Sequence, residues 1–382
     1  MELTSFPVGF EQFHRKAFVN YQLNRAHALG YAAADDLRPT AAGIRSRQDC
    51  VRLFEALATR AEAEGRLQNA ASYQRVAEFF TPPRSPEKLD RYRRYRVLFD
   101  RGFPDVAAAR MDIPYGSGFL SSYRLPAMGG VAAGTVLLHG GFDSLIEEFF
   151  GIWQRVAAGG FDVIAFDGPG QGGSRALGGL TFDHAWEKPV GAVLDQYSVE
   201  RAALVGISMG GWWALRAAGR EPRIDRVVAW PAVYDWLHRV PPGVRGAARV
   251  MVRQRRFMRW NVRVRTRLVP TLRHIVEQAQ YVVDSDDPMD AVDWFLGMNA
   301  EDLGSDRVTQ DVLLLCGEHD AFQPPKLTRA QVAALSSARS VTVRTFREAE
   351  QADRHCQMGN LALACGVVTD WLQERSSEDD RI

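Results

Sequence analysis

The sequence predicts an α/β fold with a mostly parallel central sheet, an N-terminal helical domain and an inserted helical lid. Short apolar runs alternate with helical patterns from about residue 134 onward, which is typical of a parallel sheet covered on both faces. The first part of the chain shows helical periodicity without a strong strand, and an arginine-rich stretch breaks the alternation after residue 230. A chain of 382 residues is long enough for such a core with accessory segments.

The N-terminal domain is predicted over residues 1–110 as a helical accessory or cap domain. Apolar residues at helical spacing predict helices over 47–63 and 67–80, with an interruption at Gly65. A basic, aromatic helix is expected over 91–101, before a glycine and a proline that would end it.

The α/β core is predicted in two parts, residues 111–230 and 307–382. Two short strands with glycine and proline turns begin the first part, over 113–116 and 119–125. Six apolar runs then mark the strands of the sheet, because helical stretches lie between most of them. These runs are 135–138, 163–166, 203–206, 227–230, 312–316 and 341–346.

The inserted helical lid is predicted over residues 231–306, between the fourth and fifth of these runs. Its first part is strongly basic, and no acidic residue occurs from Val240 through Ile275. Three interpretations compete: a solvated helix face paired with acids at 284–293, recognition of an anionic group or an acidic carrier protein, and nucleic-acid binding, for which no module is recognisable. The lid arginines are Arg239, Arg245, Arg249, Arg253, Arg255, Arg256, Arg259, Arg263, Arg265, Arg267 and Arg273. Candidates to line an apolar pocket under the lid are Trp236, Trp260 and Trp294.

The bulk composition is that of a soluble globular protein. The 47 basic and 46 acidic residues leave a formal charge of +1, so net charge favours neither nucleic acid nor a membrane as a partner. No secretory signal and no membrane span is visible in the sequence. The four cysteines are scattered, without metal-ligand spacing, and are interpreted as free thiols. We therefore expect a cytoplasmic protein with no metal and no cofactor.

A nucleophile elbow is predicted at Gly206-Ile207-Ser208-Met209-Gly210. The motif follows an apolar run and precedes a helical pattern, which gives the order strand, sharp turn, helix. Small residues flank the serine because the strained turn brings backbone segments close together. Ser208 is therefore the candidate nucleophile at the edge of the sheet.

A serine nucleophile needs a base and a carboxylate that orients the base. Asp320 follows the strand at 312–316 and is the leading carboxylate, while Asp235 is a rival after the preceding strand. Glu318 and His319 lie nearer the strand and are expected to serve the turn. His355 is the candidate base, because it lies in a polar loop between the last strand and a terminal helix. The remaining histidines are less well placed: His14, His27, His139, His184, His238, His274 and His319.

Donors for a developing oxyanion are expected on two turns. The turn after the first parallel strand offers the N–H of Gly141 or Phe142, and Met209 offers the N–H directly after the nucleophile. The glycine-rich segment 167–174 lacks the endings of phosphate-binding loops and is interpreted as a structural turn.

With these motifs in place, residues 111–382 resemble an α/β-hydrolase. The strings Gly140-Gly141-Phe142-Asp143-Ser144, Glu147-Glu148 and Phe166-Asp167-Gly168-Pro169-Gly170-Gln171-Gly172 are similar to those of the family that includes 2,6-dihydroxypseudooxynicotine hydrolase, whose members also carry an N-terminal helical segment. The resemblance implies a Ser208–His355–Asp320 triad. It also implies an extra glutamate after the oxyanion turn, which Glu147 or Glu148 matches. The alternative is that both glutamates are solvated acids in the first turn of a helix, without a role in catalysis.

The resemblance implies an enzyme that acts on an ester, thioester or activated carbon–carbon bond of a small organic molecule or secondary metabolite. An alternative is a lyase or cyclising enzyme on the same scaffold, with His355 as the base. A third hypothesis is a catalytically silent module that binds an acidic protein through the lid. The expected partner is a small molecule, with an anionic or carrier-bound form and a homodimer left open; no nucleic acid and no membrane are expected.

Overall fold

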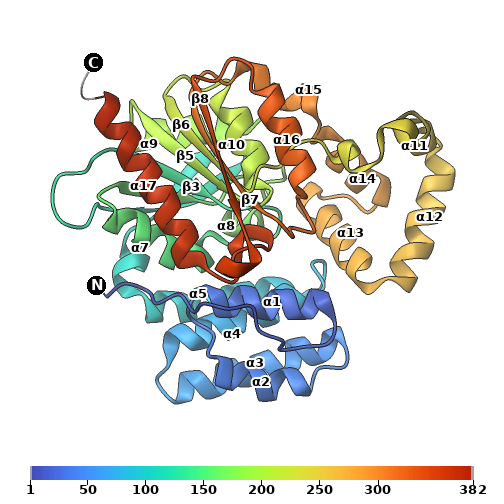
Figure 1. The fold of residues 1–382 in the computed structure, drawn as a ribbon. Helices are drawn as coiled ribbons and strands as arrows, with labels where there is room; N and C mark the ends of the chain where they lie inside the picture. The colour runs from blue at the N-terminus through green and yellow to red at the C-terminus, as the bar shows by residue number, and fades with distance from the viewer. Residues whose placement is uncertain (1, 380–382) are drawn as a thin grey trace.

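A computed structural model describes residues 2–379 and is built around an eight-stranded sheet of order β1-β2-β4-β3-β5-β6-β7-β8 (Figure 1). β1 and β2 pair antiparallel, as do β2 and β4, and every other neighbouring pair is parallel. The predicted fold class is confirmed. The strands are β1 Arg110–Tyr115, β2 Gly118–Leu125, β3 Thr135–His139, β4 Asp162–Phe166, β5 Ala202–Ile207, β6 Ile224–Trp230, β7 Asp311–Gly317 and β8 Ser340–Phe346.

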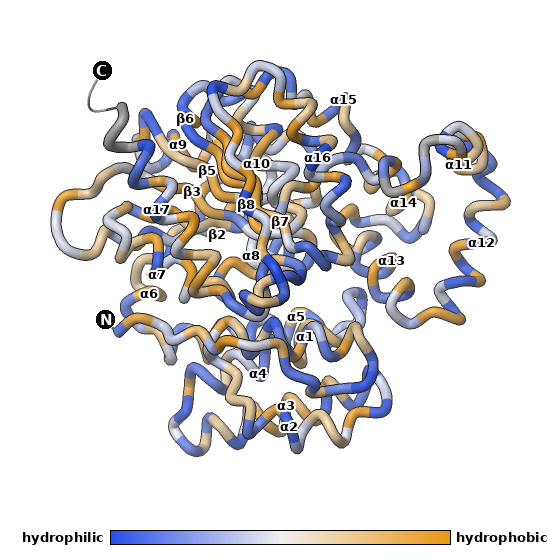
Figure 2. Tube along the Cα trace, viewed as in Figure 1, coloured by the Kyte–Doolittle hydropathy of each residue, from blue (hydrophilic) through white to orange (hydrophobic). Residues whose placement is uncertain are grey.

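The central strands are buried on both faces, which is why they read as continuous apolar runs. In β5, Ala203, Val205 and Ile207 join the apolar cluster that contains α7 and α17, while Ala202 and Leu204 join the cluster on the other face with α9 and α10. Figure 2 shows the resulting concentration of hydrophobic residues along β3, β5 and β6. The helices of the core are α7 Phe150–Ala158, α8 Gly172–Ala176, α9 Glu187–Gln196, α10 Gly210–Ala218, α16 Pro325–Ala334 and α17 Leu361–Asp379.

The N-terminal helices form a layer below the sheet in the view of Figure 1. Their start and stop signals are local: Ser46 and Asp49 form a capping box at the start of α3, and Gly65, at φ +76°, makes the turn into α4. Their apolar faces belong to the same cluster as one face of the sheet, so this domain is packed onto the core. The helices are α1 Ala17–Ala28, α2 Ala34–Ala42, α3 Arg47–Ala63, α4 Leu67–Phe80, α5 Glu87–Gly102 and α6 Pro104–Ala108.

The chain leaves the sheet after β6, runs through a set of helices at one side of the molecule and returns at β7 (Figure 1). Two of the lid arginines pair with the acidic stretch that follows: Arg255 with Asp293 and Arg259 with Asp287. The side chains of Arg239 and Arg249 lie outside the described part of the chain, as do residues 380–382. The lid helices are α11 Arg245–Arg253, α12 Arg255–Leu268, α13 Pro270–Val283, α14 Pro288–Gly297 and α15 Ala300–Leu303. Among all helices within residues 2–379, none is long and apolar enough to span a bilayer.

Candidate active site

Ser208 occupies the sharp turn between β5 and α10. Its φ of 60° lies in the left-handed region, where a residue with a side chain is strained unless its surroundings hold it. Its N–H donates to the carbonyl of Trp230 at 2.6 Å. A Cβ at Gly206 would lie 2.1 Å from the carbonyl oxygen of Gly210, and a Cβ at Gly210 would lie 2.6 Å from the carbonyl oxygen of Gly140. The glycines are therefore required for the close approach that presents the Ser208 hydroxyl.

Ser208, His355 and Asp320 form one hydrogen-bonded chain. Ser208 Oγ lies 2.9 Å from His355 Nε2, and His355 Nδ1 lies 2.8 Å from Asp320 Oδ2. The other oxygen of Asp320 accepts the backbone N–H groups of Phe322 and Gln323, each at 2.8 Å. These two donors fix the carboxylate, which in turn fixes the imidazole with Nε2 toward the serine.

The electrostatics of His355 are set by burial and by Asp320. Burial opposes the charged imidazolium, but the adjacent Asp320 carboxylate outweighs this effect and raises the pKa of His355 well above its ordinary value. The imidazole therefore has a strong affinity for a proton taken from Ser208.

The rival candidates for the carboxylate are used elsewhere. Asp235 accepts the N–H groups of Leu237 and Ala300, at 2.7 and 3.2 Å, so it caps two helical turns of the lid. Glu318 accepts the N–H of Glu348 and His319 contacts Asp353, so both serve the turn that follows β7.

Of the two candidate oxyanion donors on the turn after β3, only the N–H of Phe142 is available. Gly141 N–H donates to Ser144 Oγ at 2.9 Å. The side-chain amide of Gln171 donates to the carbonyls of Gly140 and Gly141, each at 2.9 Å. Because a trans peptide points its N–H opposite to its carbonyl, the N–H of Phe142 points away from Gln171.

Two backbone donors around Ser208 are not engaged. Within the described chain, no residue accepts a hydrogen bond from the N–H of Phe142 or of Met209. Gly141 contributes space instead, because a Cβ there would lie 2.8 Å from Ser208 Cβ and 2.9 Å from the nitrogen of Met209. The glycine-rich segment 167–174 is structural, as expected, and its Gln171 positions the turn that carries Phe142.

The Ser208 hydroxyl opens into a cavity of about 120 Å³. The core supplies one wall, the lid supplies His274 and Ile275 from α13, and α1 supplies Phe18, Tyr21, Gln22 and Arg25. Sequence reasoning assigned no site residue to α1. The available signal was the spacing i, i+3, i+4 and i+7 of these four residues, which puts them on one helix face.

The cavity is mostly aromatic and aliphatic, and its polar groups are neutral or paired. Arg25 pairs with Asp143 at 2.9 Å and with Glu148 at 2.5 Å. His274 is buried between the rings of Phe18 and Phe79, and burial lowers its pKa to about 3, so its ring is uncharged at neutral pH. Two buried polar atoms of the lining, His274 Nε2 and Gln323 Oε1, have no hydrogen-bond partner among the described residues.

A family model described as the alpha/beta hydrolase family matches residues 135–358, more than half of the chain. The chain belongs to the alpha/beta hydrolase family. The resemblance drawn from the motifs is thereby confirmed, and the chain is an enzyme.

The chain is similar to curated fungal proteins over part of its length. It is 34% identical over 204 residues to Hydrolase acrC from Aspergillus aculeatus, covering 45% of this chain and 47% of acrC. It is 34% identical over 169 residues to Hydrolyase poxO from Penicillium oxalicum, covering 40% of this chain and 38% of poxO. The match thus spans less than half the length of these relatives. The crystal structure of the 2,6-dihydroxy-pseudo-oxynicotine hydrolase shares the fold, with a TM-score of 0.63 and 19% identity over 92% of this chain and 95% of that chain.

Neither of the two candidate glutamates lines the Ser208 cavity. Glu147 is fully buried, accepts the Tyr123 hydroxyl at 2.9 Å and pairs with Arg96 at 3.1 Å. Glu148 accepts the N–H of Leu145 and pairs with Arg25 and Arg75. Both glutamates line a separate, smaller cavity of about 40 Å³ between the N-terminal domain and the core. They are not solvated acids either, since both are held by buried cations.

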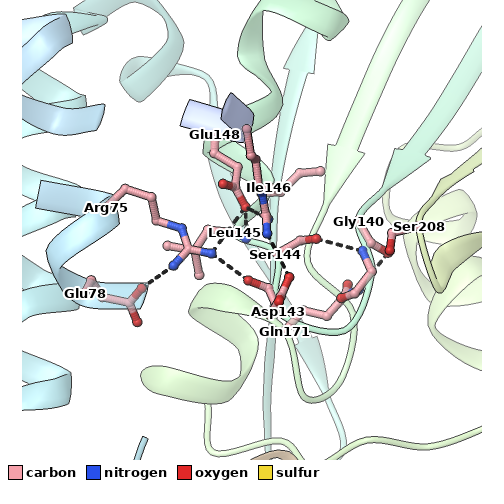
Figure 3. Close-up of polar contacts among 12 residues, drawn as sticks. Arg75, Glu78, Gly140, Asp143, Ser144, Leu145, Ile146, Glu148, Gln171 and Ser208 are labelled. Carbon is pink, nitrogen blue, oxygen red and sulfur yellow. Dashed lines mark hydrogen bonds and ion pairs between the residues drawn. The ribbon is translucent and has the colours of Figure 1, made fainter. Parts of the chain in front are cut away.

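Figure 3 shows how the second of these glutamates connects to the oxyanion turn. Arg75 reaches from α4 toward Glu148, and its Nη2 donates to the carbonyl of Asp143 at 2.5 Å. Its other terminal nitrogen, Nη1, pairs with Glu78. Asp143 lies next to Phe142 in the chain. Glu148 therefore ties the N-terminal domain to the turn beside Ser208.

The lid tryptophans occupy three different environments. Trp236 lines the Ser208 cavity, as expected. Trp294 is buried behind it and packs against Phe142, with ring centroids 5.8 Å apart. Trp260 is 60% exposed, so the expectation that it lines a pocket is wrong. In the part of the chain that the structure describes, no three His, Cys, Asp or Glu side chains are grouped so as to hold a metal ion.

Proposed function

We propose that this alpha/beta hydrolase cleaves an ester, thioester or activated carbon–carbon bond of a small organic molecule through a covalent intermediate on Ser208. The observation that carries the proposal is the hydrogen-bonded chain Ser208–His355–Asp320 at the wall of a largely apolar cavity, beside two unengaged backbone N–H groups. This arrangement contains each part that acyl transfer needs: a nucleophile, a base, an orienting carboxylate and donors for an oxyanion.

The steps follow from the geometry. Ser208 Oγ attacks the carbonyl carbon of the substrate while His355 Nε2 takes the hydroxyl proton, and the N–H groups of Phe142 and Met209 receive the developing oxyanion. His355 then gives its proton to the leaving group, which departs and leaves an acyl group on Ser208. Water attacks this acyl group with His355 again as the base, which releases the acid and restores the serine.

The lining supports a neutral, mostly apolar substrate. Arg25 is matched by Asp143 and Glu148, and His274 is uncharged, so the cavity presents no unpaired cation to a carboxylate or phosphate. Burying an anion there without a partner would be costly. We therefore favour a neutral metabolite that carries a carbonyl group over the anionic substrate that the arginine-rich lid alone suggests.

The proposal is tested with Ser208→Ala and a matched control. Ser198 is the other serine with positive φ, at 52°, and its exposed side chain lies before β5, at the opposite end of that strand from Ser208, so Ser198→Ala controls for loss of a hydroxyl at a left-handed position. With p-nitrophenyl butyrate as a probe, Ser208→Ala should lower kcat/KM by at least about 10³-fold and abolish labelling by a fluorophosphonate, while Ser198→Ala keeps both. Full turnover by Ser208→Ala would overturn the proposal.

A second candidate is elimination of water or an acid, with His355 as a base on carbon. It is favoured by the name of one relative, Hydrolyase poxO. On this mechanism the true substrate would still be turned over by Ser208→Ala but not by His355→Ala, and no oxygen from isotope-labelled water would enter the acid product. Incorporation of that oxygen, together with an acylated Ser208 peptide, supports hydrolysis.

A further inference from the structure

The lid helix α12 carries a largely exposed apolar stripe. Phe257, Trp260 and Leu268 are 48%, 60% and 75% exposed, and Val264 lies between them. Spacings of three, four and four residues place all four on one helix face. Single exposed apolar residues are ordinary, but a row of four over three turns is a surface feature. In Figure 1, α12 stands at the outer edge of the lid.

The opposite face of α12 already packs against the rest of the lid, so the exposed stripe is not the face by which this helix is held in the fold. Val262 is buried, and Arg255 and Arg259 form their ion pairs with Asp293 and Asp287 of the α14 segment. This inward face packs against α13 and α14. The outward stripe is thus free for a partner that needs only one face of the helix.

Arginines without acidic partners run along both edges of the stripe. Helical geometry puts Arg256, Arg263 and Arg267 along one edge and Arg265 along the other. All four side chains are exposed, and none of them forms an ion pair with another described residue. Because α12 and its neighbours from 240 to 275 lack acidic residues, the near-neutral net charge of the protein conceals a local cationic surface.

We propose that α12 binds an anionic lipid surface, with the stripe of Phe257, Trp260, Val264 and Leu268 in the headgroup–acyl boundary. A helix with a row of Trp, Phe and Leu and an arginine-rich polar face is the form that lies in the plane of a bilayer interface. The aromatic and aliphatic side chains would enter the boundary, and the arginines at both edges would contact anionic headgroups.

Other occupants fit the surface less well. Two copies that met through this stripe would bring their arginines together, with no acid on α12 to pair with them. A protein groove that receives an amphipathic helix surrounds much of its circumference, whereas the inward side of α12 is held by the lid. A planar anionic surface requires only the exposed face.

The location has a consequence for substrate access. Val269 joins α12 directly to α13, whose His274 and Ile275 line the Ser208 cavity. Lipid contact through α12 would place the lid side of the cavity near the phase in which apolar molecules dissolve. This role is separate from the chemistry at Ser208 and does not depend on it.

The test measures binding of the full chain to phosphatidylcholine vesicles with and without phosphatidylserine, by flotation. Phosphatidylserine should strengthen binding by about tenfold or more, and raised salt should weaken it. Arg263→Glu with Arg267→Glu, and separately Trp260→Ser with Leu268→Ser, should each reduce binding by about tenfold or more. The matched controls are Arg52→Glu with Arg93→Glu, which change charge equally at exposed helix positions, and Val131→Ser at a fully exposed site.

Each outcome bears on the proposal. The controls should bind as the unmodified protein does, and circular dichroism should show that all variants are folded. Absence of vesicle binding, binding that ignores phosphatidylserine, or equal loss in the control variants would overturn the proposal. A concentration-dependent dimer that Trp260→Ser with Leu268→Ser dissolves would assign the stripe to a second copy instead.

Discussion

Replacement of Asp320 by asparagine should lower catalysis because it moves the proton of His355 to the wrong ring nitrogen, and not because it disturbs the fold of the site. The two backbone N–H groups of Phe322 and Gln323 both require an acceptor at Oδ1. An asparagine would therefore keep its oxygen at that position and turn its NH₂ toward His355 Nδ1. The ring must then accept at Nδ1 and carry its proton on Nε2, where it faces Ser208 and cannot accept the hydroxyl proton.

The size of the effect follows from the cost of the opposite amide orientation. Turning the amide over restores the active tautomer but leaves two buried N–H donors against an NH₂ group, at about 1–3 kcal/mol each. A total of about 2–6 kcal/mol makes the productive arrangement about 30-fold to about 10⁴-fold rarer. We expect kcat/KM of Asp320→Asn to fall within this range, with a folded protein by circular dichroism.

The matched control is Asp235→Asn, at the rival carboxylate. Asp235 accepts one N–H on each of its two oxygens, and an asparagine keeps only one of these acceptors, so Asp235→Asn should lower the free energy of unfolding by about 1 kcal/mol and leave kcat/KM unchanged. The assay is hydrolysis of p-nitrophenyl butyrate, together with the rate of fluorophosphonate labelling of Ser208. The reasoning fails if Asp320→Asn stays within about threefold of the unmodified enzyme, or if Asp235→Asn loses as much activity as Asp320→Asn does.

Four further predictions concern the same machinery. Because Asp320 raises the pKa of His355 against the effect of burial, the rising limb of kcat/KM against pH should lie above the ordinary histidine value of about 6.5, and a limb at or below it would contradict the assignment. Because the pKa of His355 is higher in the folded state, its protonation should also stabilise the fold. This stabilisation should be complete below about pH 6.5 and should decrease as the pH rises through the folded-state pKa, which urea unfolding at several pH values would measure. Gln171→Leu should lower kcat by about tenfold to 100-fold with KM nearly unchanged. The carbonyls of Gly140 and Gly141 would lose their buried donor, and the Phe142 N–H would no longer be held in its orientation. A change in KM alone would refute this role. Gly141→Ala should lower kcat by about tenfold or more, because its Cβ would press on Ser208 and Met209, and normal kinetics would show that the turn can yield.

The parts of the fold that the sequence predicted well are those with local causes. The helix over 47–63 was found with its observed limits because Ser46 caps its start and Gly65 permits the turn that follows it. The strands of the parallel sheet were visible because burial on both faces leaves only apolar residues in them. The position of Ser208 was likewise local, since the elbow requires glycine on both sides of the serine.

The surroundings of the site depend on contacts between residues far apart in the chain, and these could not be predicted. The glutamates at 147 and 148 were expected to compete for a place near Ser208, but Glu148 is paired with Arg25, 123 residues earlier in the chain. The orientation of the Phe142 N–H likewise depends on Gln171, whose side chain donates to carbonyls 30 and 31 residues earlier in the chain. A single sequence shows the helix face of α1 that contains Arg25, but not the cavity that this face meets.

The buried ion pairs make the N-terminal domain part of the active site rather than an attachment. Arg25 and Arg75, from α1 and α4, both pair with Glu148, and all three side chains are more than 90% buried. Removing one member of such a group leaves an uncompensated buried charge, which costs about 3–5 kcal/mol. The same arginines contact Asp143, next to the Phe142 N–H that the mechanism assigns to the oxyanion. The domain that covers the cavity with α1 therefore also fixes the turn on which catalysis depends, so its loss would remove a wall of the cavity and loosen an oxyanion donor together.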